Sequence, residues 1–219
     1  MAKSFPDILK ETYAHPLLSK SLWESQHYIF KLDEPSEFAD IDPMDLPAMI
    51  ERTTLLLNQN QSCVGIGRYG EKRQLYQHPQ YSDRCIHLGI DICTHANTPI
   101  YAPLDGQVHQ LKNHDQAGDY GPTVILQHQI QSQTFYTLYG HLSYESLQQL
   151  SIQQSIHAGD CIGTIGSPNI NGGWPPHCHF QIIQNLRPDE DNFPGVCSEK
   201  DKQTLFALCP DPNLLLKRY

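Results

Sequence analysis

The chain has 219 residues, enough for one domain of ordinary size and a smaller accessory segment but too few for two large domains. It carries 24 acidic and 15 basic residues, and this net charge of −9 without a basic cluster argues against a nucleic-acid-binding protein. Hydrophobic residues make up 39% and charged residues 18%, a composition typical of a globular rather than a disordered protein.

The sequence also indicates a cellular compartment. No run of about 18 apolar residues is present, so no transmembrane helix is predicted. Residues 1–20 lack a continuous apolar core and a small-residue cleavage site, so we expect no secretory signal there. Seven scattered cysteines without a CxxC pair are typical of reduced thiols. We therefore expect a cytoplasmic protein, whereas a chain trimmed of its signal would be periplasmic or secreted.

Residues 1–60 are predicted to form a mainly helical segment. Ile8 and Leu9 follow Pro6 at roughly helical spacing, and a second helical pattern covers residues 43–58. No catalytic motif lies in this segment, so we interpret it as a cap or arm that packs on the main domain.

From about residue 62 the apolar residues recur with the period of two that is typical of β-strands. The strand patterns cover residues 86–92, 100–103, 108–111, 123–128, 134–139, 162–165 and 177–183. Asp105-Gly106 is a hairpin signal between the second and the third of these patterns. Many short strands with glycine-rich turns predict a mainly β fold of the α+β type, built on an antiparallel sheet.

The chain is expected to divide into three parts. The helical N-terminal segment spans residues 1–60, and a β-sheet domain with most of the histidines spans residues 61–186. A proline-rich C-terminal wrap with one short helix spans residues 187–219. The sequence gives no indication of the oligomeric state.

Three strand segments place histidines where they could act together. His87 and Asp91 are four residues apart and point to the same side of a strand, as do His177 and His179. His141 ends another apolar strand. Each motif alone is weak, because two histidines on a strand are more often exposed or hydrogen-bonded than metal-binding. Together they supply two imidazoles and a carboxylate for zinc, with further imidazoles left for proton transfer.

The motifs carry a resemblance to a known family. HLGID at 87–91, YGHLS at 139–143 and PPHCHFQI at 175–182, in this order, resemble the lysostaphin-type zinc endopeptidases of the M23 family, which have LytM-like domains. The flanking stretches PIYAPLDGQV at 99–108 and HAGDCIGTIG at 157–166 are also similar to that family. The resemblance covers roughly residues 84–184 and implies a LytM-like core for the β-sheet domain.

The resemblance also implies roles for individual residues. His87, Asp91 and His179 would bind one zinc ion, and His141 and His177 would be catalytic histidines that do not bind the metal. The protein would then be a metalloendopeptidase that hydrolyses peptide bonds, with peptides of the peptidoglycan type as substrates. Zinc would activate the attacking water, one histidine would act as general base, and its partner would stabilise the oxyanion or protonate the leaving amine. The two histidine roles are not assigned individually.

Two departures from the family pattern keep other functions open. The loop at 169–176 is lengthened, and Gln181 stands where the family commonly has glutamate. One alternative is a binding or regulatory module that retains zinc without hydrolysing peptides. Another is a hydrolase of a small cytoplasmic substrate.

Several further residues have two interpretations. The cluster at 68–73 could orient a substrate carboxylate through its arginines, although a salt-bridged surface turn is the more common outcome. Cys85 and Cys93 share a strand face with His87 and Asp91, which allows a thiolate near zinc, but buried free thiols are more common. Trp174 could be a substrate platform or could simply pack in its loop.

Overall fold

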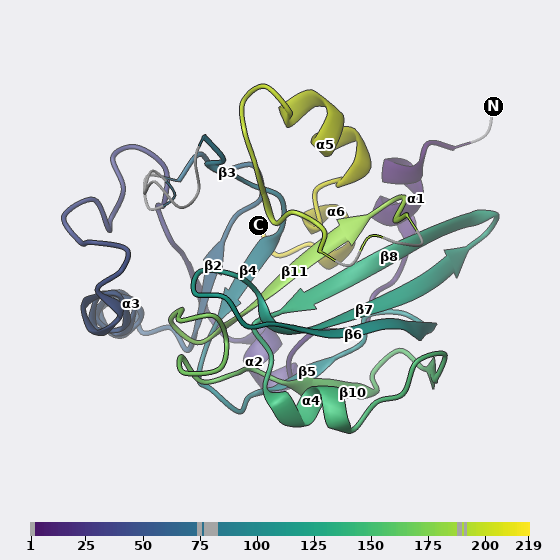
Figure 1. Cartoon of the computed structure of the whole chain (residues 1–219), viewed down its shortest axis with the longest axis horizontal. Helices are drawn as coiled ribbons and strands as arrows, with labels where there is room; N and C mark the ends of the chain where they lie inside the picture. The colour runs from purple at the N-terminus through teal and green to yellow at the C-terminus, as the bar shows by residue number, and fades with distance from the viewer. Residues whose placement is uncertain (1–2, 74–75, 77–82, 188–189, 191) are drawn as a thin grey trace.

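An eight-stranded sheet crosses the protein in the computed structural model (Figure 1). The structure describes residues 3–73, 76, 83–187, 190 and 192–219. In spatial order the strands are β1 (His27–Ile29), β2 (Val64–Gly67), β4 (Ile90–Cys93), β11 (His177–Ile183), β8 (Gln133–Gly140), β7 (Gly121–Ile130), β6 (Gly106–His114) and β9 (Ser155–Ile156). In this described sheet only β1 and β2 pair in parallel, so the predicted mainly β fold on an antiparallel sheet is confirmed except at this edge.

Two short strand pairs lie outside the large sheet: β5 (Pro99–Tyr101) with β10 (Cys161–Thr164), and β3 (Ile86–His87) with β12 (Val196–Cys197). The hairpin predicted at Asp105-Gly106 is therefore wrong, because β5 pairs with β10 while β6 pairs with β7 and β9. The N–H groups of Tyr101 and Ala102 donate to the carbonyls of Leu17 and Asp160, so the donors at this end of β5 are engaged away from β6.

The single strand predicted over 86–92 is interrupted after His87. The N–H of Leu88 donates to the carbonyl of Gly195 at 2.9 Å, and the chain enters the large sheet only at β4. A Cβ on Gly89 would lie 2.6 Å from Cε1 of His179, so only glycine lets this connection pass so close to the ring. His87 and Asp91 remain neighbours despite the break.

The described residues contain six helices: α1 (Phe5–Glu11), α2 (Lys20–Glu24), α3 (Leu46–Gln59), α4 (Tyr144–Gln148), α5 (Lys202–Leu208) and α6 (Asn213–Leu216). The carboxylate of Asp45 caps α3 by accepting the N–H of Ala48 at 3.1 Å, and Pro47 occupies the first turn. Three helices fall within residues 1–60, but the prediction of a mainly helical segment missed β1, which extends the sheet instead. None of the described helices is long and apolar enough to cross a membrane.

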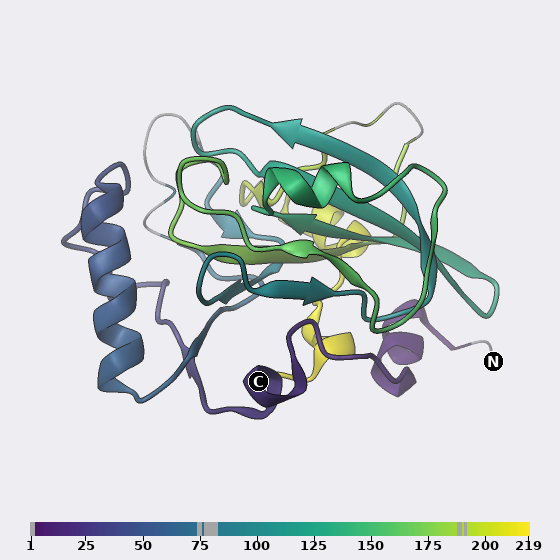
Figure 2. The same cartoon turned by 90° about the horizontal axis from the view of Figure 1, so that it is seen from below.

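The main hydrophobic core lies on the face of the sheet opposite the histidines. It contains Ile90 and Ile92 of β4, Phe180 and Ile182 of β11, and Tyr139 of β8, all fully buried. Residues of the N-terminal and C-terminal segments, including those of α1 and α6, complete this core. Figure 2 shows α3 standing beside the sheet, away from this core. The boundaries at 60/61 and 186/187 stay a prediction.

Candidate metal centre

Three predicted residues converge on the face of the sheet opposite the main core. Asp91 on β4 lies directly opposite His179 on β11, because the two strands pair in antiparallel register. His87, at the end of β3, completes the group. Its Nε2 lies 3.2 Å from Oδ1 of Asp91 and 3.0 Å from Nδ1 of His179, and the last two atoms are 3.1 Å apart. All three side chains are buried.

The two imidazoles have hydrogen-bond partners on the side away from Asp91. Nδ1 of His87 lies 2.9 Å from the carbonyl oxygen of Arg68, which can only accept, and 2.9 Å from Nη2 of Arg73, which can only donate. With its proton on Nδ1, directed at Arg68, His87 keeps a lone pair on Nε2. Nε2 of His179 lies 2.9 Å from Oε1 of Gln181, whose amide nitrogen donates to the carbonyl of Pro194. His179 therefore donates through Nε2 and keeps the lone pair on Nδ1.

This arrangement fits a metal ion. In the tautomers with outward protons, two imidazole lone pairs and one carboxylate oxygen meet at about 3 Å, an arrangement that a cation among them would stabilise. Among the described residues, His87, Asp91 and His179 are the one group of three whose ligand atoms all lie within 4.8 Å of one another. Hydrogen bonds from each imidazole to an outer acceptor are usual at such sites.

A buried arginine accompanies the carboxylate. Nη1 of Arg73 lies 2.6 Å from Oδ2 of Asp91, and Nε lies 3.3 Å from Glu71. Although burial opposes it, His87 and the Arg73 guanidinium beside the carboxylate hold the pKa of Asp91 well below its usual range. The expected surface turn at 68–73 does form ion pairs, but Arg73 and Glu71 are 2% and 3% exposed at their side chains, and Arg73 extends to the candidate ligand Asp91.

His141 and His177 lie next to the three candidate ligands. Their ring centroids are 4.2 Å apart, and Nε2 of His177 lies 3.8 Å from Oδ1 of Asp91. Nδ1 of His141 donates to the carbonyl of Asn171, and Nδ1 of His177 donates to that of Pro175, each at 2.7 Å. Both rings therefore keep a lone pair on Nε2. Burial lowers the pKa of both imidazoles, so the neutral form is favoured.

Asn171 is a positioning residue that the sequence analysis missed. It is fully buried, and its side chain accepts the N–H of Trp174 and donates to the carbonyl of the same residue, both at 3.0 Å. Its own carbonyl holds His141. The following Gly172 and Gly173 have φ values of +91° and +86°, which signal a tight turn, but only the fold shows that the turn reaches His141.

The cysteines near the site are not part of the ligand group. Cys93 lies beside the cavity and Cys85 packs among apolar residues. Burial raises the pKa of the Cys93 thiol, which keeps it protonated. Both cysteines are half-buried rather than fully buried, and neither belongs to the group of candidate ligands.

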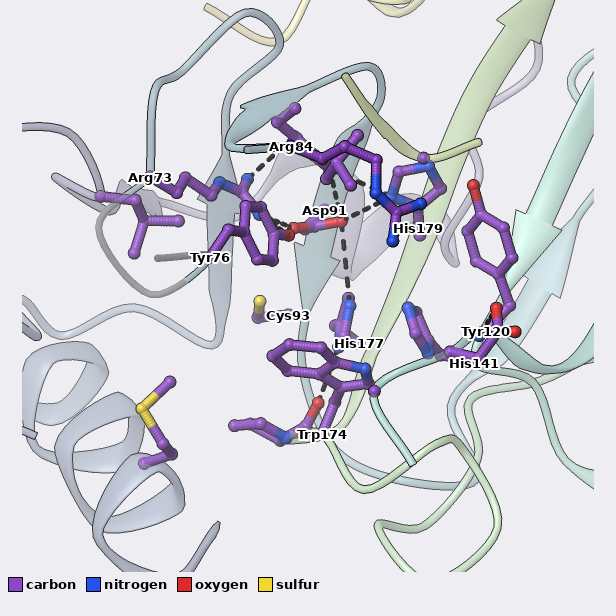
Figure 3. Close-up of a pocket in the computed structure, with 18 of the residues that line it drawn as sticks. Arg73, Tyr76, Arg84, Asp91, Cys93, Tyr120, His141, Trp174, His177 and His179 are labelled. Carbon is purple, nitrogen blue, oxygen red and sulfur yellow. Dashed lines mark hydrogen bonds and ion pairs between the residues drawn. The ribbon is translucent and has the colours of Figure 1, made fainter. Parts of the chain in front are cut away.

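A cavity of about 420 Å³ opens over the cluster. The histidines and Asp91 form one side, and Tyr120 and Trp174 lie along it (Figure 3). The opposite side comes from the N-terminal segment and consists of Phe30, Leu32, Phe38, Met49 and Thr53. The ring of Trp174 is 6.3 Å from that of His141, so this side chain lies at the cavity rather than packing wholly within its loop.

Comparisons with known proteins agree with the geometry. The sequence model of "Peptidase family M23" matches residues 85–190. The peptidoglycan DD-endopeptidase ShyA of Vibrio cholerae is 33% identical over 111 residues, which are 51% of this chain and 23% of that protein. An uncharacterized metalloprotease of Haemophilus influenzae is 32% identical over 155 residues, 64% of this chain and 30% of that protein.

A search of solved structures matched the catalytic domain of the antimicrobial peptidase lysostaphin from Staphylococcus simulans, with 22% identity and a TM-score of 0.41. The match covers 61% of this chain and 80% of that one. The chain spans less than a third of the length of the two curated relatives.

Proposed function

Residues 85–190 form a peptidase M23 domain, and from this we propose that the protein is a zinc-dependent metallopeptidase. The observation that carries the proposal is the convergence of His87 Nε2, Asp91 Oδ1 and His179 Nδ1, three atoms that could each bind one metal ion through a lone pair. Such a set of two nitrogens and one oxygen is typical of catalytic zinc, which keeps a position open for water.

These three residues would hold one zinc ion. Bound there, zinc supplies Lewis-acid chemistry, which polarises the scissile carbonyl and increases the acidity of water. Arg73 engages Oδ2 of Asp91 and leaves Oδ1 directed at the two imidazoles. Gln181 orients the ring of His179.

His141 and His177 would move the protons. Each ring is held through Nδ1 by a backbone carbonyl and presents Nε2 with its lone pair. One Nε2 accepts the proton of the attacking water as general base. The adjacent ring, once protonated, donates to the oxyanion or to the leaving amine. Because the two rings are only 4.2 Å apart, both Nε2 atoms would reach oxygen or nitrogen atoms on the same carbon of the scissile bond.

The relatives support a substrate class for this proposal. ShyA is named a peptidoglycan DD-endopeptidase, and we extend this to the present chain as a substrate of the peptidoglycan peptide type. The cavity holds a peptide of a few residues, since its volume falls within the roughly 300–1,000 Å³ of small-ligand sites.

The proposal is tested by hydrolysis of muropeptides with purified protein. A chelator should abolish cleavage, and zinc added afterwards should restore it. His177→Ala should retain stoichiometric zinc, measured by atomic emission, but lose cleavage by about 100-fold or more. Cleavage that persists without metal would refute the proposal, as would a His177→Ala protein with full activity.

A further inference from the structure

We propose that Phe30, Leu32, Phe38 and Met49, here called the apolar wall, form a subsite for an apolar side chain of the peptide substrate beside the bond that is cut. All four lie outside the M23 match, in the segment that the sequence analysis interpreted as a cap or arm. The inference rests on the proposed peptidase function and adds the kind of side chain that the site selects.

The apolar wall is fixed to the sheet. The N–H of Phe30 donates to the carbonyl of Ile66 at 2.9 Å, in line with the parallel pairing of β1 and β2. The ring of Phe30 occupies the space where Gly65 lacks a Cβ, and it packs edge-on against Phe38 with centroids 6.0 Å apart. The wall therefore has a defined position relative to β4, which carries Asp91.

Helix α3 supplies the outer part of the apolar wall. Met49 is 5% exposed and faces the cavity together with Thr53, one turn further along the helix. Arg52 binds both carboxylate oxygens of Asp40 at 3.0 and 2.8 Å, which holds α3 to the loop before it. This bidentate pair joins α3 to the loop that carries Phe38, another residue of the wall.

The apolar wall and the metal site border one continuous cavity. Cys93 lies between them, on the strand that carries Asp91 (Figure 3). Trp174 packs against the same apolar cluster and also faces His141. A molecule that touches the wall is therefore in position to present a bond to His177 and His141. This continuity identifies the occupant as part of the substrate.

The chemistry of the wall selects the side chain. The described residues of the N-terminal segment that line the cavity are four apolar side chains and Thr53, with no charged group among them. A charged side chain placed against the wall would lose its hydration without gaining a partner from it, since the charged residues that line the cavity, such as Arg73, Arg84 and Asp119, belong to other segments. A leucine-like side chain would instead bury apolar surface.

The experiment compares three blocked pentapeptides, Gly-Gly-Xaa-Gly-Gly, in which Xaa is Gly, Leu or Asp. We expect kcat/KM for the Leu peptide to exceed that for the Gly peptide by about 10-fold or more, with the Asp peptide poorest. Thr53→Trp, which fills the space before the wall, should remove the preference for Leu while the Gly peptide is still cleaved. Leu55→Trp is the matched control, because Leu55 is 47% exposed on the same helix and does not line the cavity.

The outcomes separate the subsite from the peptidase function. If all three peptides are cleaved equally, or if both tryptophan variants act alike, the subsite is refuted and the peptidase function stands. If no peptide is cleaved, the peptidase function fails for these substrates, and calorimetric binding of the same peptides decides the subsite. Tighter binding of the Leu peptide that Thr53→Trp abolishes would support it, and equal binding would refute it.

Discussion

His141 adopts a backbone conformation that most side chains avoid. Its φ of +62° lies in the left-handed region, which costs an L-residue about 1–2 kcal/mol, although histidine is found there more often than most residues. The N–H of His141 donates to the carbonyl of Tyr120, and the N–H of Gly166 donates to the carbonyl of His141. The surrounding loops thus hold the residue in this conformation and present its ring to the cavity.

This conformation predicts an unusual order of stability among variants at position 141. His141→Gly and His141→Ala both remove the ring, but only alanine retains the left-handed strain. Alanine normally stabilises a protein over glycine by roughly 0.4–1 kcal/mol, because it lowers the conformational entropy of the unfolded chain. The cost of the left-handed conformation exceeds this gain. We therefore expect the glycine variant to be the more stable of the two in urea unfolding, with both lacking hydrolysis. If His141→Ala proved more stable than His141→Gly, the left-handed conformation would not cost the alanine variant the expected free energy.

Gln181 is expected to affect metal binding although it does not contact the metal position itself. It is fully buried, and its oxygen accepts the Nε2 proton of His179. Gln181→Leu removes this acceptor and should weaken zinc binding about 10- to 100-fold in a chelator competition assay. Gln181→Glu keeps an acceptor at the same place and should retain most of the affinity. Equal affinities of the leucine variant and the natural protein would show that the hydrogen bond does not position the ring.

At the scale of elements, the alternating pattern was the most informative part of the sequence. The period of two correctly placed His177 and His179 on one side of a strand, with Cys178 and Phe180 buried on the other. The same period placed His87 and Asp91 on one side of their strand. In the structure β4 and β11 are neighbours, which brings Asp91 directly opposite His179. The assignment of ligand and catalytic roles came from the family resemblance and stays a prediction.

Other elements could not be predicted because their partners are distant in the sequence. β5 pairs with β10, about sixty residues later, so the local hairpin signal at Asp105-Gly106 was misleading. β1 is three residues long and joins the sheet only through β2. The link from Asn171 to His141 depends on the folded loop, and no local pattern encodes it.

The β7–β8 pair contains a buried histidine with a consequence for acid stability. His128 is 1% exposed, and its ring lies 2.8 Å from the carbonyl of Asp105 and 2.7 Å from the hydroxyl of Thr137. Burial lowers the pKa of His128 from 6.5 to about 4, although the carbonyl and carboxylate of Asp105 act in the opposite direction. The unfolded chain therefore binds a proton in the range between these values while the folded chain does not.

The free energy of unfolding should consequently fall as the pH is lowered through this range. From pH 7 to pH 5 the contribution of His128 amounts to a loss of about 2 kcal/mol. His128→Gln cannot be protonated, so its unfolding free energy should decline less over the same interval, measured by urea titration at each pH. If the unfolding free energies of the two proteins fell equally with pH, the pKa of His128 would not be lowered in the folded state. The comparison cancels the contributions of the other buried histidines.

At the scale of the whole molecule, the two ends of the chain meet on the core side of the sheet. Nζ of Lys217 donates to the carbonyl of Thr12 at 3.2 Å, and the guanidinium of Arg218 stacks on Trp23 at 4.5 Å. The N-terminal segment also buries Leu9 and Leu17 fully in the main core. Residues before 61 are therefore part of the structure that supports the metal site.

Removal of residues 1–60 should prevent stable folding. Each fully buried leucine or phenylalanine stabilises the fold by about 1.5–3 kcal/mol, and loss of several would exceed the margin of about 5–15 kcal/mol of a typical domain. We expect a chain that starts at residue 61 to lack a cooperative thermal transition by circular dichroism. A transition within a few degrees of that of the full chain would instead show that the boundary at 60/61 separates independent units.

The central position of β11 determines when the site is completed during synthesis. β11 lies between β4 and β8 and is the strand that joins the two halves of the large sheet. It also carries His177 and His179, which are synthesised after all the other strands of the large sheet. Because chains are made from the N-terminus, a nascent chain has two unconnected half-sheets and only one of the two candidate imidazole ligands until then. Translation products that end before β11 would thus lack both the continuous sheet and the candidate metal site.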